Sequence, residues 1–363
     1  MARWRQLTKV GGLAVGAAAA SAGVVLAAEK IAVGRLRLRP DLAADEPFGQ
    51  LRGRPVAVLA DDGVPLHAEV SGPDDAPVTI IFSHGYTLSQ DIWHYQRQAL
   101  AGTARLVFWD LRGHGRSGRN SDHGVPEQVS IERLGTDLGL VLAATAPGDC
   151  PVVLVGHSMG GMTIMALAAQ RPELFGTKVI GTVLISTAAS GIDPAAWLPA
   201  PLRPVVRHAA PAVLRGASQR GPAALIERGR QAAGDVAFLS TRYFAFGDPD
   251  VSPTVVDFLE RIIRATPVAV VTEFYLALLA HDERAALDVL SRVPTMVMTG
   301  DRDRLVSARL AGEVAAGIPG ADMILVPGGG HLLILERPEV VNEAITALVA
   351  RALSRAGGKR RLA

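Results

Sequence analysis

The sequence predicts an α/β fold, in which a mostly parallel sheet of eight strands carries helices on both faces. From Arg54 onward, short runs of apolar and β-branched residues recur along the chain, and segments with the helical period separate the later runs. These runs are apolar at nearly every position, which is typical of parallel strands that are buried on both faces. One doubly wound domain accounts for both observations.

The first two predicted strands form a hairpin, because the Asp62-Gly63 pair between them favours a tight turn. In chain order the predicted strands are Pro55–Ala60, Leu66–Val70, Val78–Ser83, Arg105–Trp109, Val152–Gly156, Val179–Ser186, Thr295–Gly300 and Met323–Val326. The predicted helices between and after them are Asp91–Leu100, Ser130–Ala144, Gly160–Arg171, Ser307–Ala316 and Pro338–Ser354. We therefore expect a core in two parts, residues 54–187 and 292–355, with a linker at 41–53 and a basic tail at 356–363.

The alternation of strands and helices stops within residues 188–291. This stretch has many prolines and no convincing strand, and its best-defined helical segments are Ser252–Arg264 and Val268–His281. Ser252 is a natural N-cap, and Pro253 suits the first helical turn. Ligands of open α/β sheets bind beyond the carboxyl ends of the strands, so we predict that this insertion between the sixth and seventh strands is a helical cap. A simple cover over a sheet edge is the alternative.

Residues 1–40 differ from the rest of the chain. Residues 10–28 carry no charged side chain, and a helix of that length reaches roughly 28 Å, close to the ~30 Å hydrocarbon layer of a membrane. We favour an uncleaved membrane anchor, because Lys30 and Arg35 follow the apolar run and positive charge there disfavours translocation. A signal peptide that is cleaved from a secreted protein and a soluble helix of a cytoplasmic protein are the alternatives.

Composition narrows the range of partners. The formal net charge is only +2, which is too small to indicate a nucleic acid partner. Cys150 is the single cysteine, so the chain forms no intrachain disulfide and no cysteine-rich zinc site. The sequence contains no phosphate-binding loop and no dinucleotide fingerprint, so we expect neither a cofactor nor a metal. It carries no signal for an oligomeric state.

The pentapeptide Gly156-His157-Ser158-Met159-Gly160 lies between a predicted strand and a predicted helix. In that context the Gly-x-Ser-x-Gly pattern predicts a nucleophile elbow. The serine of such an elbow sits in a strained turn, so the residues two positions before and after it must lack bulk. Gly156 and Gly160 meet that demand. Ser158 is therefore the predicted nucleophile.

A serine hydroxyl becomes a good nucleophile when a base removes its proton and a third group orients the base. His331 is the candidate base, because it follows a predicted strand and a run of three glycines at the carboxyl edge of the sheet. Asp303 is the candidate orienting carboxylate, and Asp301, two residues earlier, is the alternative. The chain order serine, aspartate, histidine differs from the orders of chymotrypsin-like and subtilisin-like proteases.

The oxyanion that forms when serine attacks a carbonyl group needs two backbone N–H donors. Met159, directly after the nucleophile, is predicted to supply one of them. The loop after strand Val78–Ser83 reads His84-Gly85-Tyr86, and we expect the second donor to be the N–H of Tyr86. Gly85 would allow the chain to turn sharply at this point.

Several segments resemble the α/β-hydrolase superfamily. They are Phe82–Tyr86, Asp110–Ser117, Gly156–Gly161, Gly300–Asp303 and Gly330–His331. The resemblance implies the α/β-hydrolase fold and a Ser-Asp-His triad formed by Ser158, Asp303 and His331. The Gly-His-Ser-Met-Gly-Gly run is similar to that of monoacylglycerol lipases, lysophospholipases and haloperoxidase-like esterases. Because one fold carries many reactions, the resemblance implies the reaction class and not the substrate.

The expected reaction is hydrolysis of a carboxylic ester with an apolar or lipid-like acyl group, through an acyl-enzyme on Ser158. A small-molecule ester is thus the expected partner. A peptidase, a C–C hydrolase or a perhydrolase with the same triad is the alternative within enzymes. A non-catalytic small-molecule receptor on the same fold is the alternative outside catalysis. Serine at the elbow disfavours the epoxide hydrolases and haloalkane dehalogenases of this fold, which attack with aspartate.

Overall fold

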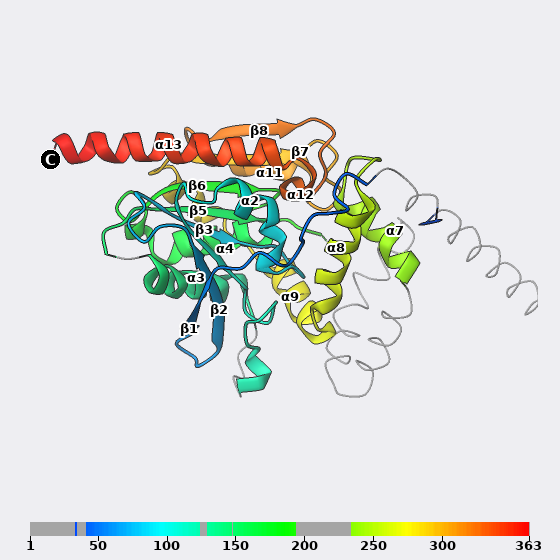
Figure 1. Cartoon of the computed structure of the whole chain (residues 1–363). Helices are drawn as coiled ribbons and strands as arrows, with labels where there is room; N and C mark the ends of the chain where they lie inside the picture. Colours follow the sequence, from blue (N-terminus) through cyan, green and yellow to red (C-terminus); the bar gives the residue numbers. More distant parts are fainter. Residues whose placement is uncertain (1–32, 35–40, 124–128, 147, 194–233, 363) are drawn as a thin grey trace, which may run out of the picture.

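An eight-stranded sheet forms the centre of the computed structural model, which describes residues 33–34, 41–123, 129–146, 148–193 and 234–362 (Figure 1). The strands are β1 (Arg54–Leu59), β2 (Pro65–Ser71), β3 (Thr79–Ser83), β4 (Arg105–Trp109), β5 (Val152–His157), β6 (Val179–Ile185), β7 (Thr295–Gly300) and β8 (Asp322–Val326). Their order is β1-β2-β4-β3-β5-β6-β7-β8; β2 is antiparallel to both of its neighbours, and the other pairs are parallel. No strand end differs from its predicted position by more than one residue, so the predicted sheet is confirmed.

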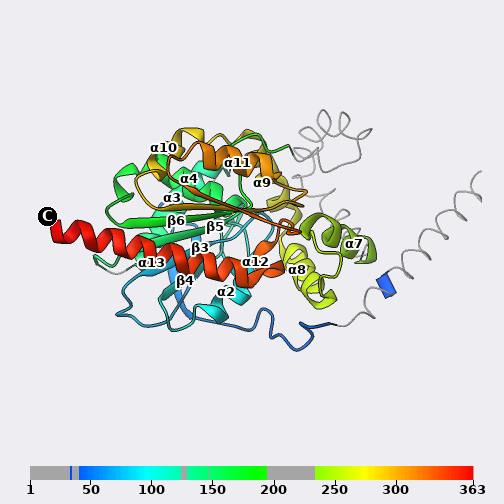
Figure 2. The ribbon, with the colours of Figure 1, turned by 90° about the horizontal axis from the view of Figure 1, so that it is seen from above.

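Helices cover both faces of this sheet (Figure 2). One face carries α3 (Ile131–Thr145), α4 (Met159–Gln170), α10 (Leu287–Leu290) and α11 (Ala308–Ala316), and the other carries α2 (His94–Ala99), α12 (Leu333–Glu336) and α13 (Pro338–Leu362). Short 3₁₀ turns are η1 (Gln90–Trp93), η2 (Asn120–His123), η3 (Pro172–Leu174) and η6 (Arg284–Ala286). The described helices of the core thus form two layers around the sheet.

Two helix predictions differ from the structure. The expected helix 91–100 is divided into η1 and α2, and its first turn is held by Asp110, which accepts a hydrogen bond from the N–H of Gln90 at 2.7 Å. Helix α13 ends at Leu362 instead of Ser354. No proline follows Ser354 to stop the helix.

Strand β5 shows why the strands are apolar at consecutive positions. Side chains alternate along a strand between the two faces of a sheet. Val152 and Leu154 accordingly belong to the core cluster that contains α3 and α4, whereas Val153 and Val155 belong to the cluster that contains α13. All four are buried. Burial on both faces anchors the carboxyl end of β5, where the candidate nucleophile follows.

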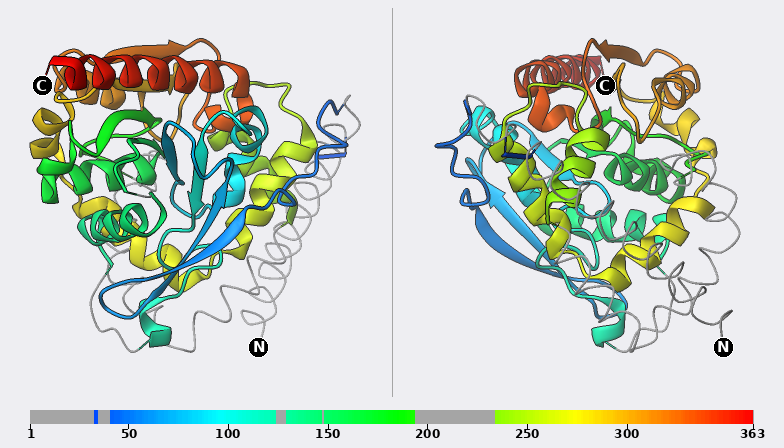
Figure 3. Two further views of the ribbon diagram at one scale, coloured as in Figure 1. Left: turned by 60° about the vertical axis from the view of Figure 1, so that its left-hand side comes forward. Right: turned by 90° about the vertical axis from the view of Figure 1, so that its right-hand side faces the viewer.

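The predicted cap is confirmed between β6 and β7. Its described helices are α7 (Gly234–Ala245), α8 (Pro253–Ala265) and α9 (Val268–Ala280), and they lie together at one end of the sheet (Figures 1 and 3). The Ser252 side chain accepts a hydrogen bond from the N–H of Val255, as expected of the N-cap of α8. Residues 194–233 of the predicted cap lie outside the described residues.

The segment 41–53, predicted as a linker, contacts cap helix α8. The carboxylate of Asp41 accepts hydrogen bonds from the N–H and hydroxyl of Thr254 at 3.1 and 2.6 Å. The ring of Phe48 stacks on that of Phe258, with centroids 4.5 Å apart. This segment therefore supports the first turns of α8.

The predicted membrane anchor, residues 10–28, lies outside the described residues. In the described part of the chain, no single helix has both the length and the apolar composition to cross a membrane. Helices α8 and α9 have the necessary length and apolar composition only when they are taken together, and the pair is bent by 93° at its junction.

The two ends of the cap meet beside the core. Ser190 and Asp282 form an isolated β-bridge, and the N–H of Glu283 donates to the carbonyl of Ala189 at 2.7 Å. The Glu283 side chain is buried, and its Oε1 has no hydrogen-bond partner among the described residues. Burial raises the pKa of Glu283 from 4.5 to about 7, and the nearby carboxylates of Glu132 and Asp282 add to this effect.

We expect Glu283→Gln to weaken the pH dependence of stability. The pKa of Glu283 is higher in the folded than in the unfolded chain, so its stabilising contribution is full below pH 4.5 and is lost as the pH rises through about 7. Glutamine has the same shape and no charge. Between about pH 5 and about pH 8, the melting temperature of the wild type should therefore fall more than that of the variant.

The matched control is Glu343→Gln, which changes an exposed glutamate on α13 and should follow the wild type. Equal falls in melting temperature for the wild type and Glu283→Gln would contradict the raised pKa.

Candidate active site

Ser158 lies in a sharp turn between β5 and α4. Its backbone has φ +53° and ψ −118°, a conformation that non-glycine residues rarely adopt. A Cβ atom on Gly156 would lie 2.5 Å from the carbonyl oxygen of Gly160, and one on Gly160 would lie 2.0 Å from that of Ser83. Both positions therefore require glycine, as the elbow motif predicts.

The predicted oxyanion donors flank this turn. Met159 is the first residue of α4, where an N–H group has no acceptor within the helix and the helix dipole is positive. On the other side, a Cβ atom on Gly85 would lie 3.1 Å from the Cβ atom of Ser158, so the loop that carries Tyr86 passes close to the serine. The Tyr86 hydroxyl donates to the carbonyl of Val271 on cap helix α9.

The structure brings Asp303 and His331 together from the ends of β7 and β8. Nδ1 of His331 lies 2.9 Å from Oδ2 of Asp303, and both side chains are buried. The other carboxylate oxygen of Asp303 accepts hydrogen bonds from the N–H groups of Leu305 and Val306, each at 2.8 Å. These two bonds fix the carboxylate in the orientation that faces the imidazole.

Asp301, the alternative carboxylate, has a different contact. Its Oδ1 accepts a hydrogen bond from the N–H of Gly328 at 2.7 Å. It therefore holds the glycine-rich loop that leads to His331, whereas Asp303 contacts the imidazole itself.

His157, inside the elbow, supports the same loop. Its Nε2 donates to the carbonyl of His331 at 2.9 Å, and the two imidazole centroids lie 4.8 Å apart. Burial, reinforced by the neighbouring His331, holds the pKa of His157 well below its usual 6.5. The ring is thus neutral, and it positions the His331 backbone without adding charge to the site.

Glu336 is a supporting residue that the sequence analysis did not identify. Its Oε2 accepts from the N–H of Gly330 at 2.6 Å, and its Oε1 accepts from the N–H of Gly247 at 2.9 Å. One carboxylate therefore ties the residue before His331 to the chain that leaves α7 of the cap. Burial raises the pKa of Glu336. An acidic residue directly after the apolar run Leu332–Leu335 was the available signal.

Ser158 and His331 line one cavity of about 180 Å³. Apolar side chains of the cap complete it, among them Leu259 and Ile263 from α8 and Leu278 from α9. The cavity combines a hydroxyl, an imidazole with a buried carboxylate behind it, and an apolar enclosure. Such a set can carry out nucleophilic acyl transfer. Within the described residues, no three His, Cys, Asp or Glu side chains are placed to hold a metal ion.

Comparisons with known proteins agree with this architecture. The sequence pattern of the alpha/beta hydrolase family matches residues 80–344. The chain is 29% identical over 300 residues to the pimeloyl-(acyl-carrier protein) methyl ester esterase of Stenotrophomonas maltophilia, covering 81% of this chain and 99% of that protein. It is 31% identical over 134 residues to a monoacylglycerol lipase of Mycolicibacterium smegmatis, covering 36% and 47%.

Among solved structures, a thermophilic esterase from Thermogutta terrifontis superposes with a TM-score of 0.61 at 23% sequence identity, covering 82% of this chain and 98% of that one. This likeness confirms the α/β-hydrolase fold that the sequence predicts.

Proposed function

The chain belongs to the alpha/beta hydrolase family, and on that premise we propose that it is a serine esterase with Ser158 as nucleophile, His331 as base and Asp303 as orienting carboxylate. The observation that carries the proposal is the 2.9 Å contact between His331 and Asp303 at the cavity that Ser158 also lines. Esterases among the relatives support the ester class.

The proposed mechanism begins with the Asp303 carboxylate, which accepts the Nδ1–H of His331 and leaves Nε2 free to take the serine proton. The Ser158 oxygen attacks the ester carbonyl, and the N–H groups of Met159 and Tyr86 stabilise the oxyanion. His331 then donates its proton to the departing alcohol, which leaves an acyl-enzyme. Water, deprotonated by His331, attacks the acyl-enzyme in the same way and releases the acid.

The cavity supports a neutral, apolar acyl group as the substrate. Among the described residues that line it there is no Asp, Glu, Lys or Arg, and most of these side chains are aliphatic. A charged acyl group would lose its hydration there without gaining a partner.

A panel of chromogenic esters beside a panel of matching amides tests which type of bond the enzyme cleaves. Faster cleavage of the amides than of the esters would identify a peptidase instead.

Ser158→Ala should lower kcat for ester hydrolysis by more than roughly 10⁴-fold with the fold intact, because the substitution removes the nucleophilic oxygen and triad residues act as a unit. A fluorophosphonate probe should label the wild type and not the variant, as intact mass shows. His331→Ala should cost a comparable amount.

His281→Ala is the control, because this imidazole contacts the carbonyls of Leu278 and Ala188 at the end of the cap. More than a few per cent residual activity in pure Ser158→Ala protein would reject Ser158. A wild type that neither labels nor hydrolyses esters would favour a non-catalytic receptor.

Asp303→Asn should reduce kcat strongly, by up to about 10⁴-fold, because an amide in place of the carboxylate favours the wrong histidine tautomer. Asp301→Asn is the matched variant two residues away. Since the Asp301 carboxylate bonds to the N–H of Gly328, whereas that of Asp303 contacts the imidazole of His331, the Asp301 substitution should lower kcat far less. The kcat values are measured on purified proteins of equal melting temperature. A larger loss of kcat in Asp301→Asn than in Asp303→Asn would identify Asp301 as the orienting carboxylate.

We further propose that residues 10–28 attach the protein to a membrane, on the basis of their apolar sequence. The intact protein should then sediment with membranes in high salt and in carbonate. Deletion of residues 1–32 leaves every described residue in place and should release a soluble enzyme with unchanged kcat/KM. A mature chain that begins near Ala28 would show signal cleavage instead, and soluble full-length protein would reject both.

A further inference from the structure

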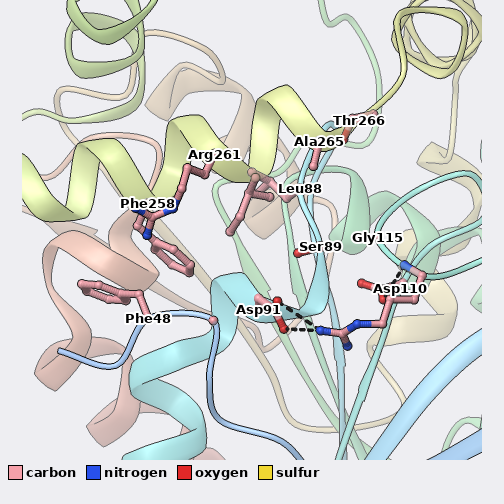
Figure 4. A pocket seen from close by; sticks show the side chains of 13 residues that line it. Phe48, Leu88, Ser89, Asp91, Asp110, Gly115, Phe258, Arg261, Ala265 and Thr266 are labelled. Atoms are coloured by element: carbon pink, nitrogen blue, oxygen red, sulfur yellow. Dashed lines mark hydrogen bonds and ion pairs between the residues drawn. The ribbon is translucent and has the colours of Figure 1, made fainter.

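A second pocket (Figure 4), of about 310 Å³, lies beside the active-site cavity. Helix α8, the segment 41–53 and the loops after β3 and β4 form its walls. Of the residues that the structure describes, Leu88 alone lines both this pocket and the cavity of Ser158. Figure 4 shows its side chain under α8, and it is only 4% exposed. The Leu88 side chain therefore separates the two spaces.

The loop that carries Leu88 is held firmly by its backbone. The Leu88 N–H donates to the carbonyl of Gly85 at 3.2 Å. The carbonyl of Thr87 accepts from the hydroxyl of Thr266 at the end of α8, at 3.0 Å, and the N–H of Thr87 donates to Nε2 of His114 at 3.2 Å. None of these bonds uses the Leu88 side chain. A truncation at this position should thus leave an opening, because the backbone around it has little freedom to collapse.

The second pocket is able to receive an alkyl chain. Phe258 and Ile262 give it an apolar wall on the α8 side. Three of its charged residues pair with one another: Arg116 contacts Asp91 at 3.3 Å, and Asp110 accepts from the N–H of Arg116 at 3.0 Å. The fourth charged residue of its lining, Arg261 on α8, is exposed. A chain that extended from Ser158 past position 88 would lie along the apolar wall without breaking those pairs.

We propose that Leu88 sets the upper length of the acyl group, so that this hydrolase takes esters of short, neutral acyl chains that end against the Leu88 side chain. The active-site cavity, at about 180 Å³, is smaller than the roughly 300–1,000 Å³ of pockets that enclose drug-sized ligands. Removal of the side chain should join it to the neighbouring pocket of about 310 Å³. The inference rests on the proposed ester hydrolysis at Ser158.

The test compares kcat/KM for p-nitrophenyl butyrate and p-nitrophenyl decanoate in the wild type and in Leu88→Ala. The ratio of decanoate to butyrate should rise by about tenfold or more in Leu88→Ala, since each methylene accommodated in an apolar pocket contributes about tenfold or more. Leu88→Val should raise the same ratio by a smaller factor. If Leu88→Ala does not fold, Leu88→Val takes its place in the test.

Two control variants enlarge one space without joining the two. Ile262→Ala changes only the second pocket and should leave the ratio as in the wild type. Leu278→Ala changes only the active-site cavity and should raise the ratio less than Leu88→Ala. An unchanged ratio in folded Leu88→Ala and Leu88→Val, or an equal rise in either control, would overturn the role of Leu88.

Binding measurements separate this inference from the proposed function. Calorimetric titration of both esters into Ser158→Ala, with and without Leu88→Ala, reports the length preference without turnover. A gain of about tenfold or more in decanoate affinity over butyrate affinity supports the Leu88 wall even if the wild type hydrolyses no ester. Absence of that gain overturns it even if the esterase activity is established.

Discussion

The close approach of helix α4 to strands β3 and β5 is the constraint on which the candidate site depends. Ser158 can hold its strained backbone because Gly156 and Gly160 leave no side chain between the elements. A Cβ atom on Gly160 would lie 2.0 Å from a carbonyl of β3, so any other residue would push the helix away. That approach brings the serine, the start of α4 and the loop of Tyr86 to one corner of the sheet. Burial of β5 on both faces supplies the stability that sustains the strain.

Around this corner, buried polar groups determine where the imidazole of His331 lies. Asp303 contacts the ring, His157 bonds the backbone carbonyl of the same residue, and Glu336 bonds the N–H before it. Each of these three comes from a different segment of the core. Because Glu336 also bonds the chain leaving α7, the cap and the histidine loop share one carboxylate, and their positions are not independent. Buried hydrogen bonds of this kind favour one arrangement, since an unpaired buried group is costly.

Much of this architecture is predictable because its signals are local. Runs of β-branched residues, the Asp62-Gly63 turn and the Ser252 cap act over a few neighbours, and the structure has all of them. The division of the helix near Gln90 was not predictable, because its first turn depends on Asp110 at the end of another strand. Glu336 was missed for the same reason: its N–H partners lie in loops far apart in the sequence.

The sequence by itself determined the order of strands and helices, the cap between β6 and β7, and the residue types of the candidate triad. Tertiary structure decided which of two chemically identical carboxylates faces His331, since Asp301 and Asp303 differ only in the path of the loop around them. It also decided the shape of the cavity, whose walls come from β-strand ends and from cap helices that meet only after folding. Contacts between distant segments depend on how whole elements pack, and no local pattern of residues encodes that packing.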